Sequence, residues 1–193
     1  MQQIFYSLFA TPLGVCGIAW RGFGSKHTRP AVVFLQLPEA TVEATKERIA
    51  GSTGGRRSDP PPATIAEITE RICTHLQGEA QDFSDIEVDL EGLGGFTQQV
   101  LAACRKIPAG GTLSYSELAR VIQRPKAVRA VGQALARNPV PLIIPCHRVL
   151  TLDGRAGGFS APGGLETKRW LLAREGVTIK EETYELVRSK KDI

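Results

Sequence analysis

Long apolar runs are absent from this 193-residue chain, and its cysteines are few and scattered. No stretch reaches the roughly 18 consecutive apolar residues of a membrane-spanning helix, so no membrane partner is expected. The segment MQQIFYSLFA lacks the basic leader and apolar core of a secretory signal. The four cysteines show no short paired spacing, which argues against a disulfide framework and a zinc knuckle. We therefore expect a reducing location: cytoplasmic, and nucleoid-associated in a bacterium or nuclear in a eukaryote.

Charge is distributed unevenly along the chain. Residues 96–174 hold 12 Lys and Arg and three acidic residues, which gives a formal charge of +9. The rest of the chain holds 12 Lys and Arg and 17 acidic residues, which gives a formal charge of −5. A cationic half is either a solvated basic face or a surface for a polyanion such as nucleic acid. The length allows one large or two small domains, and no internal repeat is visible.

The N-terminal half has the pattern of a small sheet covered by helices. Two β-rich runs flank Thr11–Gly14, which predicts a hairpin, and AVVFLQL at residues 31–37 predicts a third strand. Helical composition marks residues 39–50. A second helix is expected over residues 63–77, because apolar residues recur at steps of three and four. Those residues are Ile65, Ile68, Ile72 and Leu76.

Turn-forming residues divide the chain. The Gly-, Ser- and Pro-rich residues 51–62 predict a mobile surface loop, and the alternation in DIEVDLEGL predicts a last strand before a linker at Gly92–Gly95. The expected organisation is an N-terminal domain at 1–92, a second domain at 93–179 and a charged tail that frays at 180–193.

The second half is predicted to contain a helix-turn-helix. Ser114 with Glu117 fits a capping box, so a helix is expected to start there and to stop before Pro125. Pro125 is expected to open the next helix as its first residue, and that helix is expected to end at Asn138 before Pro139. An earlier helical face is formed by Phe96, Val100, Cys104 and Ile107.

The second of these helices combines a polar stripe with small residues. Small residues let a helix backbone approach a surface closely, and a polar stripe can meet phosphates, although any helical hairpin can carry a solvated basic face. The stripe consists of Lys126, Arg129, Gln133 and Arg137. The inward residues are predicted to be Val128, Val131 and Leu135, and the small ones are Ala127, Ala130, Gly132, Ala134 and Ala136.

The segment LIIPCHRVL, residues 142–150, places a cysteine directly before a histidine. Its apolar run has strand character and ends at Pro145. A thiolate needs a nearby base or cation at neutral pH, and His147 and Arg148 follow Cys146. Adjacent residues of an extended segment point to opposite sides, so a bridging water is the expected route for the proton. This pattern makes Cys146 a candidate nucleophile.

The remaining cysteines and histidines lack such a setting. Cys104 lies in an apolar pattern without an acid–base neighbour, as do Cys16 and Cys73, and all three are predicted to be core residues. His27 and His75 are interpreted as ordinary surface or interior histidines. A metal site assembled from Cys16, His27, Cys73 and His75 is the weaker alternative, and no metal is expected.

Four segments resemble the O6-alkylguanine-DNA alkyltransferases, also called methylated-DNA–protein-cysteine methyltransferases. They are NPVPLIIPCHRVL, SYSELA, RPKAVRAVGQALARNP and KRWLLAREG, in the same order and spacing across residues 96–177. TPLGVCGIAW is similar to that family's N-terminal domain. The resemblance implies an α/β (α+β) fold, with an N-terminal ribonuclease H-like sheet-and-helix domain. It also implies a C-terminal, mainly helical, winged-helix-like domain.

The same resemblance implies direct-reversal DNA repair. An alkyl group moves irreversibly from O6 of guanine in double-stranded DNA to the protein, once per molecule, without a cofactor and with a monomer as the active unit. Cys146 matches the alkyl acceptor, His147 the residue that deprotonates it through a water, and Glu175 the carboxylate that orients the histidine. Asn138 matches the residue that braces the active-site turn, and Tyr115 the one that assists the leaving guanine and crowds the target phosphate.

The resemblance also implies DNA-binding and pocket residues. Arg129 matches the arginine that enters the stack where the base is flipped out, with its helix in the minor groove. In GGFSAPGG, Ala161 and Pro162 look like an insertion into the family's aromatic-Ser-Gly-Gly stretch. The remaining implied positions are Tyr115, Ser116, Thr97, Arg124, Lys126, Ala127 and Gln133 on DNA, and Phe159, Ser160 and Val149 around the base.

Two other classes of function remain open from the residues alone. A DNA-binding module could sense alkylated bases without transfer, but the presence of Cys146 argues against it. A cysteine hydrolase could use Cys146 with His147, but it needs an oxyanion hole, of which the sequence gives no independent sign.

Overall fold

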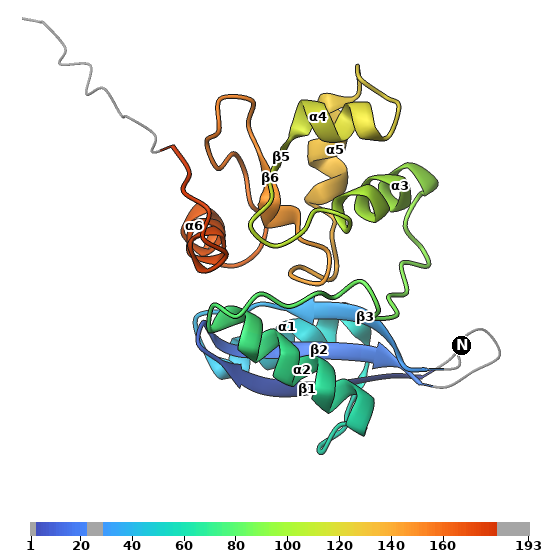
Figure 1. The fold of residues 1–193 in the computed structure, drawn as a ribbon. Helices are drawn as coiled ribbons and strands as arrows, with labels where there is room; N and C mark the ends of the chain where they lie inside the picture. Colours follow the sequence, from blue (N-terminus) through green and yellow to red (C-terminus); the bar gives the residue numbers. More distant parts are fainter. Residues whose placement is uncertain (1–2, 23–28, 181–193) are drawn as a thin grey trace, which may run out of the picture.

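A four-stranded sheet and a helical half make up the part of the chain that the computed structural model describes, residues 3–22 and 29–180 (Figure 1). The strand order is β3-β2-β1-β4. β1 and β2 form the predicted hairpin, paired antiparallel from Ile4↔Arg21 to Thr11↔Gly14, and β4 runs parallel to β1. The strands are β1 (Ile4–Thr11), β2 (Gly14–Arg21), β3 (Ala31–Gln36) and β4 (Arg56–Arg57).

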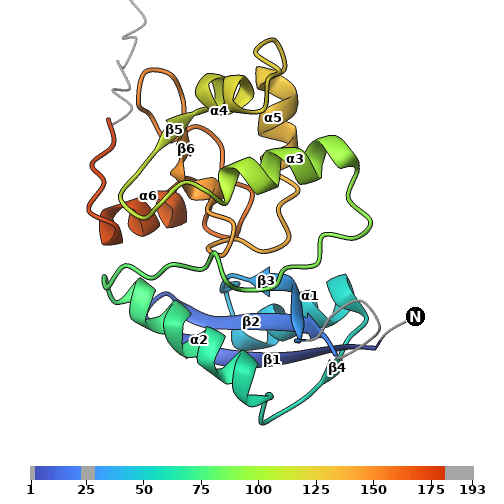
Figure 2. The ribbon, with the colours of Figure 1, turned by 45° about the vertical axis from the view of Figure 1, so that its right-hand side comes forward.

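Two helices cover opposite faces of this sheet (Figures 1 and 2). α1 (Val42–Thr53) packs Ile49 against Tyr6 and Ala19, whereas α2 (Ala63–Leu76) packs its predicted isoleucine stripe on the other side. Because both faces are covered, the middle of β2 is buried continuously instead of at alternate residues.

Two predictions for residues 51–90 are wrong in part. The expected loop over 51–62 contains the end of α1, where the Thr53 hydroxyl donates to the C=O of Ile49 at 2.7 Å, and then β4. The expected strand in DIEVDLEGL is reduced to one isolated bridge, between Val88 and Val32. Val32 exchanges backbone hydrogen bonds with Glu87 and Asp89 there, and this pairing is an isolated bridge rather than a strand.

The helical half surrounds a small parallel two-stranded sheet, β5 (Leu113–Ser114) with β6 (Val149–Leu150) (Figure 2). The predicted capping box is confirmed, because Ser114 Oγ accepts from the Glu117 N–H and the Glu117 carboxylate accepts from the Ser114 N–H. The helices are α3 (Gly95–Cys104), α4 (Tyr115–Val121), α5 (Val128–Leu135), the 3₁₀ helix η1 (Cys146–Arg148) and α6 (Gly164–Arg174).

The start of the second helix of the helix-turn-helix was predicted wrongly. α5 begins at Val128 rather than at Pro125, because Gln123 adopts a left-handed φ of 58° and the Arg124 N–H closes α4 by donating to Ala119. As a consequence Val128 is 37% exposed rather than in the core, whereas Val131 and Leu135 are buried as expected.

The apolar run before Pro145 is a buried turn, not a strand. Leu142 has a left-handed φ of 71°, and Pro141 forms an isolated bridge with Ile144 across the turn. Cys146 then begins η1, so Cys146 and His147 do not alternate as they would on an extended segment.

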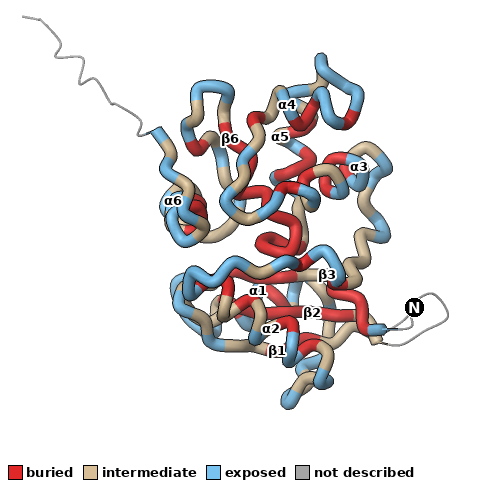
Figure 3. The backbone as a smooth tube through the Cα atoms, in the orientation of Figure 1, coloured by how far each residue is buried: buried red, intermediate tan, exposed pale blue. Residues whose placement is uncertain are grey.

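The two halves share one continuous core (Figure 3). The cluster that contains Trp20 and Leu35 of the sheet also contains Val140 and Cys146 of the helical half. A backbone hydrogen bond of 2.8 Å from Leu35 to Pro139 reinforces this contact. The turn that carries Cys146 is thus packed against the sheet, while His27 and nearly all of the predicted tail lie outside the described residues.

Candidate active site

Asn138 holds the turn that leads to Cys146. Its Nδ2 donates to the C=O of Ile144 at 2.8 Å and to Cys146 Sγ at 3.2 Å, while its Oδ1 accepts from the Val140 N–H at 3.1 Å. One amide therefore satisfies backbone groups on both sides of the turn and also contacts the sulfur. These bonds hold Leu142 in a conformation that a leucine rarely adopts.

Cys146 is a nearly buried thiol, 8% exposed. Burial raises the pKa of Cys146, because the apolar surroundings disfavour the thiolate. The hydrogen bond from Asn138, the charge of Lys168 and nearby backbone N–H groups act in the opposite direction. The thiol is therefore protonated in the free protein, and hydrogen-bond donors and a cation lie near Sγ, where they stabilise the thiolate when it forms.

Glu175, at the C-terminal cap of α6, is the centre of a buried ion network behind this cysteine. Its side chain is 1% exposed, and Oε1 lies 2.9 Å from Nε2 of His147. Arg148 binds the carboxylate in a bidentate manner, with Nη2 at 2.8 Å from Oε1 and Nε at 2.9 Å from Oε2. Although burial raises the pKa of Glu175, the donors outweigh it and hold that pKa well below its usual range.

This network fixes the tautomer of His147. An ionised carboxylate only accepts hydrogen bonds, so Nε2 of His147 donates to Glu175 and Nδ1 is left as the basic nitrogen. Nδ1 is buried and has no hydrogen-bond partner among the described residues. Burial lowers the pKa of His147 despite the opposing effect of Glu175, so the ring is neutral and able to accept a proton at neutral pH.

Lys168 on α6 is a second buried cation near the cysteine. It is completely buried, and its Nζ donates to the C=O of Val149 at 2.6 Å and to that of Gly158 at 3.4 Å. Burial lowers the pKa of Lys168 to about 8. Sequence reasoning missed this residue, although its place three residues before Leu171 put it on a buried helical face.

A cavity of about 430 Å³ opens onto Cys146, a volume typical of small-molecule sites. Tyr115 from α4, Gly132 from α5, Phe159 and Ser160 are among the residues that line it. The Tyr115 hydroxyl donates to the C=O of Gly158 at 3.4 Å. Val149 is completely buried, and its C=O accepts a hydrogen bond from Lys168. It is not among the residues that line this cavity.

A second cavity of about 420 Å³ reaches Cys146 from the side of the sheet. It shares Phe159 and Ser160 with the first cavity, and Ala161 and Pro162 extend its wall. The two residues that looked inserted therefore lie at the active site, between the helical half and β3.

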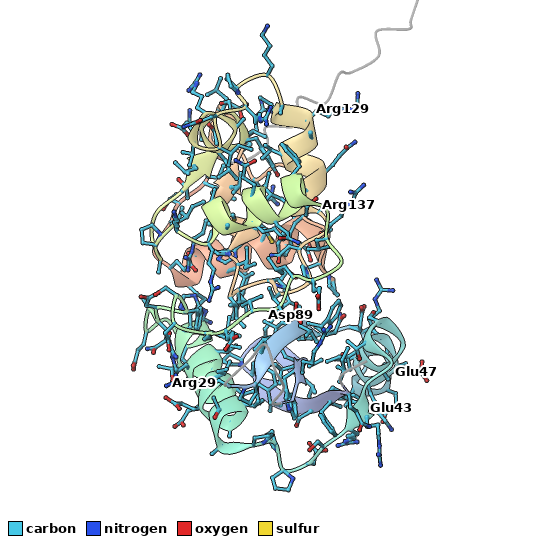
Figure 4. All side chains as sticks on the ribbon, turned by 90° about the vertical axis from the view of Figure 1, so that its right-hand side faces the viewer. Arg29, Glu43, Glu47, Asp89, Arg129 and Arg137 are labelled. Atoms are coloured by element: carbon cyan, nitrogen blue, oxygen red, sulfur yellow. The ribbon has the colours of Figure 1, made fainter. Side chains whose placement is uncertain are left out.

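The residues expected to meet DNA lie mostly on α4, on α5 and on the segments that directly precede and follow α5. Arg129 and Arg137 project from the same side of the helical half, whereas Glu43 and Glu47 project from α1 (Figure 4). Thr97 departs from this pattern, since it is only 5% exposed in the first turn of α3. Arg124, Lys126, Arg129, Gln133 and Arg137 are exposed, and Ser116 and Ala127 are half-buried.

The other cysteines are free thiols in different surroundings. Burial raises the pKa of Cys16 to about 12 and that of Cys104 well above its ordinary value. Cys73 is half-buried and donates to the C=O of Ala10. Within the described residues, no three His, Cys, Asp or Glu side chains gather as a candidate metal site, and no helix is long and apolar enough to cross a membrane.

Comparisons with known proteins agree on one family. The family model described as 6-O-methylguanine DNA methyltransferase, DNA binding domain, matches residues 95–177. A methylated-DNA–protein-cysteine methyltransferase of Mycolicibacterium paratuberculosis is 35% identical over 90% of this chain and 93% of that protein. One from Haemophilus influenzae is 34% identical over 92% of this chain and 89% of that protein.

Solved structures give the same result for the fold. Mycobacterium tuberculosis O6-methylguanine methyltransferase superposes with a TM-score of 0.71 at 32% identity, covering 93% of this chain and 97% of that one. Mycobacterium tuberculosis OGT in complex with DNA gives a TM-score of 0.68 at 33% identity, covering 89% and 92%. With this identity along most of both chains, the protein belongs to the methylated-DNA–protein-cysteine methyltransferase family.

Proposed function

We propose that this protein repairs alkylated DNA directly, by moving an alkyl group from O6 of guanine in double-stranded DNA to Sγ of its own Cys146. The observation that carries the proposal is the position of Cys146, which lines a cavity while the His147–Glu175 pair lies behind it. Relatives that share most of the chain are named for this methyl transfer, and one OGT was solved in complex with DNA.

The reaction requires the damaged base to leave the helix. An alkyl carbon on O6 lies inside the base stack, and extruding the nucleotide costs a few kcal/mol. We infer that α5 lies in the minor groove and that Arg129 enters the stack in place of the flipped base. Exposed cations such as Lys126 and Arg124 would bind phosphates, which sets affinity without reading the sequence.

Proton transfer prepares the nucleophile. The Cys146 thiol gives its proton through a bridging water to Nδ1 of His147, the basic nitrogen left free by the hydrogen bond between Nε2 and Glu175. The negative charge of Glu175 stabilises the resulting imidazolium, while Asn138 and Lys168 stabilise the thiolate.

Alkyl transfer then forms one bond and breaks one. Sγ of Cys146 attacks the alkyl carbon, a carbon–sulfur bond forms, and the bond from that carbon to O6 breaks with its electrons passing to guanine. The Tyr115 hydroxyl, whose pKa is raised by burial so that it stays protonated, is the donor to the charge that develops on the base. The product is a thioether, which no ordinary protein group cleaves, so each molecule acts once.

The domain architecture completes the proposal. We infer that residues 1–92 form a ribonuclease H-like domain and that residues 93–179 form a winged-helix-like domain carrying the DNA-binding and catalytic residues, with a charged tail from 180. Phe159, Ser160 and Val149 are assigned to the base pocket, with Phe159 and Ser160 as its walls and Val149 as support. We further propose that the protein acts as a cytoplasmic monomer without a cofactor.

The decisive experiment is a single-turnover assay. The full chain is mixed with excess duplex DNA carrying labelled O6-methylguanine, and the label is located by mass spectrometry of the digested protein. We expect at most one methyl group per molecule, on the peptide that contains Cys146, and none in the Cys146→Ala variant, which still binds the duplex. Repeated turnover, or methylation of Cys104 with Cys146 unmodified, would contradict the proposal.

A further inference from the structure

His75, near the C-terminal end of α2, contacts the same carboxylate that holds His147. Its Nε2 lies 2.9 Å from Oε1 of Glu175, the oxygen that also lies 2.9 Å from Nε2 of His147. His75 is 3% exposed and the Glu175 side chain 1%, so water does not weaken the contact. The bond therefore joins the sheet half to the active site across 100 positions of sequence.

Neighbouring groups fix the hydrogen-bonding roles of the two ring nitrogens and the orientation of this histidine. The backbone N–H of Gln81 donates to Nδ1 of His75 at 3.1 Å, so Nδ1 is the acceptor and Nε2 carries the hydrogen that it donates to Glu175. The ring also packs edge-on against Phe83, with centroids 5.3 Å apart. His75 thus donates from Nε2 and is held by its own helix and by the segment that follows it.

The position of Glu175 explains why such a donor matters. Glu175 follows the last helical residue of α6, and Gly176 after it adopts a left-handed φ of 75°, so the helix backbone alone does not fix the carboxylate. Three donors converge on Oε1, from His75, His147 and Arg148. His75 is the one that comes from the sheet half, and each donor takes a share of the negative charge on that oxygen.

We propose that His75 is a positioning residue of the alkyl-transfer site, through which the sheet half holds Glu175 in the orientation that His147 requires. This inference rests on the proposed function, since it concerns how fast Cys146 accepts an alkyl group. The charged and titratable groups that face Glu175 are His75 from α2 and His147 and Arg148 from η1, and Lys168 from α6 acts on the cysteine.

The test compares two variants of His75 in the full chain. His75→Phe keeps a ring beside Phe83 but lacks the donor, whereas His75→Gln retains an N–H donor. The rate of Cys146 alkylation by free O6-benzylguanine is measured from pH 5.5 to 9, because the free base needs no flipping. Glu70→Gln, an exposed change on the same helix, is the matched control, and thermal melting checks that each variant folds.

We expect His75→Phe to react about tenfold more slowly, because the carboxylate that orients His147 loses one of the three donors on Oε1. The acidic limb of its pH–rate profile should move to higher pH. With one hydrogen bond fewer to its carboxylate, Glu175 stabilises the protonated form of His147 more strongly, which raises the pKa of His147. His75→Gln should restore most of the rate and the original limb, and Glu70→Gln should match the unaltered protein.

Two results would overturn the inference. One is a His75→Phe variant with an unaltered rate and pH profile. The other is a variant that is slower by the same factor at every pH, melts at a lower temperature and is not restored by His75→Gln, because that pattern reflects packing alone. Failure of the proposed function would give a different result from failure of this inference, because the unaltered protein itself would then leave Cys146 unalkylated.

Discussion

The side-chain amide of Asn138 donates to Sγ of Cys146 at 3.2 Å, and the same nitrogen donates to the C=O of Ile144 at 2.8 Å. A single side chain therefore closes the active-site turn and favours the charged form of the thiol that the turn carries. Structure and reactivity are coupled at this residue, because the bond that shapes the backbone also stabilises the thiolate.

Asn138→Ala should affect both properties. We expect the free energy of unfolding to fall by about 1–3 kcal/mol, because the N–H of Val140 loses its side-chain acceptor in a buried turn, while the C=O of Ile144 keeps the N–H of Cys146 as a donor. The pKa of Cys146 should rise further, since the amide donor opposes the effect of burial. Urea unfolding and the pH dependence of Cys146 alkylation measure the two effects. Glu47→Gln on the exposed surface of α1 should leave both unchanged, and equal effects in the two variants would contradict the assignment.

Arg129→Ala should separate base flipping from chemistry. Transfer from O6-methylguanine in duplex DNA is expected to slow at least tenfold. A loss of ~1.4 kcal/mol in the stabilisation of the flipped-out nucleotide lowers the rate by a factor of ten. Transfer from free O6-benzylguanine should be unchanged, because that base is already outside a helix. The measurement is the pair of single-turnover rates. Arg56→Ala, at an exposed arginine of β4, is the control, and equal losses on both substrates would reject the role of Arg129.

Lys168→Met should slow alkylation in a pH-dependent way. Lys168 has a pKa of about 8, so at pH 7 it is charged and favours the thiolate of Cys146, whereas the charge is lost as the pH rises through 8. We expect the unaltered protein to react about tenfold faster than the variant at pH 7, an electrostatic effect of about 1.4 kcal/mol. The difference should narrow at pH 9. Rates with free O6-benzylguanine at both pH values test this, and a constant ratio would show that the charge is not responsible.

The same lysine makes a prediction about stability. Its pKa in the folded protein, about 8, lies below the ordinary value of 10.5, so the unfolded chain binds more protons between these pH values. The free energy of unfolding of the unaltered protein, relative to that of Lys168→Met, should therefore increase from pH 8 towards 10.5 and stay level below pH 7. Urea unfolding at a series of pH values measures this difference in the free energy of unfolding. A decrease in the difference between pH 8 and 10.5 would contradict the prediction.

Gly157→Ala should disturb the wall of the base cavity. Gly157 has a left-handed φ of 63°, and an added Cβ would lie 3.1 Å from Cε2 of Tyr115 and 3.2 Å from Cγ2 of Thr151. We expect the free energy of unfolding to fall by about 1–2 kcal/mol, because alanine is strained in this conformation. Gly158→Ala is the matched control, since a Cβ there meets nothing within 4 Å, and its unfolding should be nearly unchanged. Similar losses at both positions would contradict this explanation.

The sequence by itself determined the features that depend on neighbours along the chain. The hairpin around Pro12 follows from two β-rich runs and a turn, and α2 follows from its isoleucine spacing. The capping box of Ser114 with Glu117 set the start of α4. The adjacency of Cys146 and His147 also indicates the candidate site without reference to any tertiary contact.

Tertiary structure decided the features that depend on distant partners. Leu142 and Gln123 adopt left-handed conformations, which a propensity for strand or helix does not predict. The run before Pro145 is a turn because the Asn138 side chain bonds to its backbone, and β4 forms because β1 offers a free edge beside it. The pattern of apolar residues along the chain does not predict these hydrogen bonds.

The active-site network shows the same division. Nothing near His75 in the sequence distinguishes it from an ordinary interior histidine, and its partner Glu175 is 100 positions away. Periodicity specifies which face of α2 is buried but not what that face meets. Only the packing of the sheet half against the helical half brings His75 to the carboxylate of Glu175, since a hydrogen bond depends on atoms within about 3 Å rather than on order along the chain.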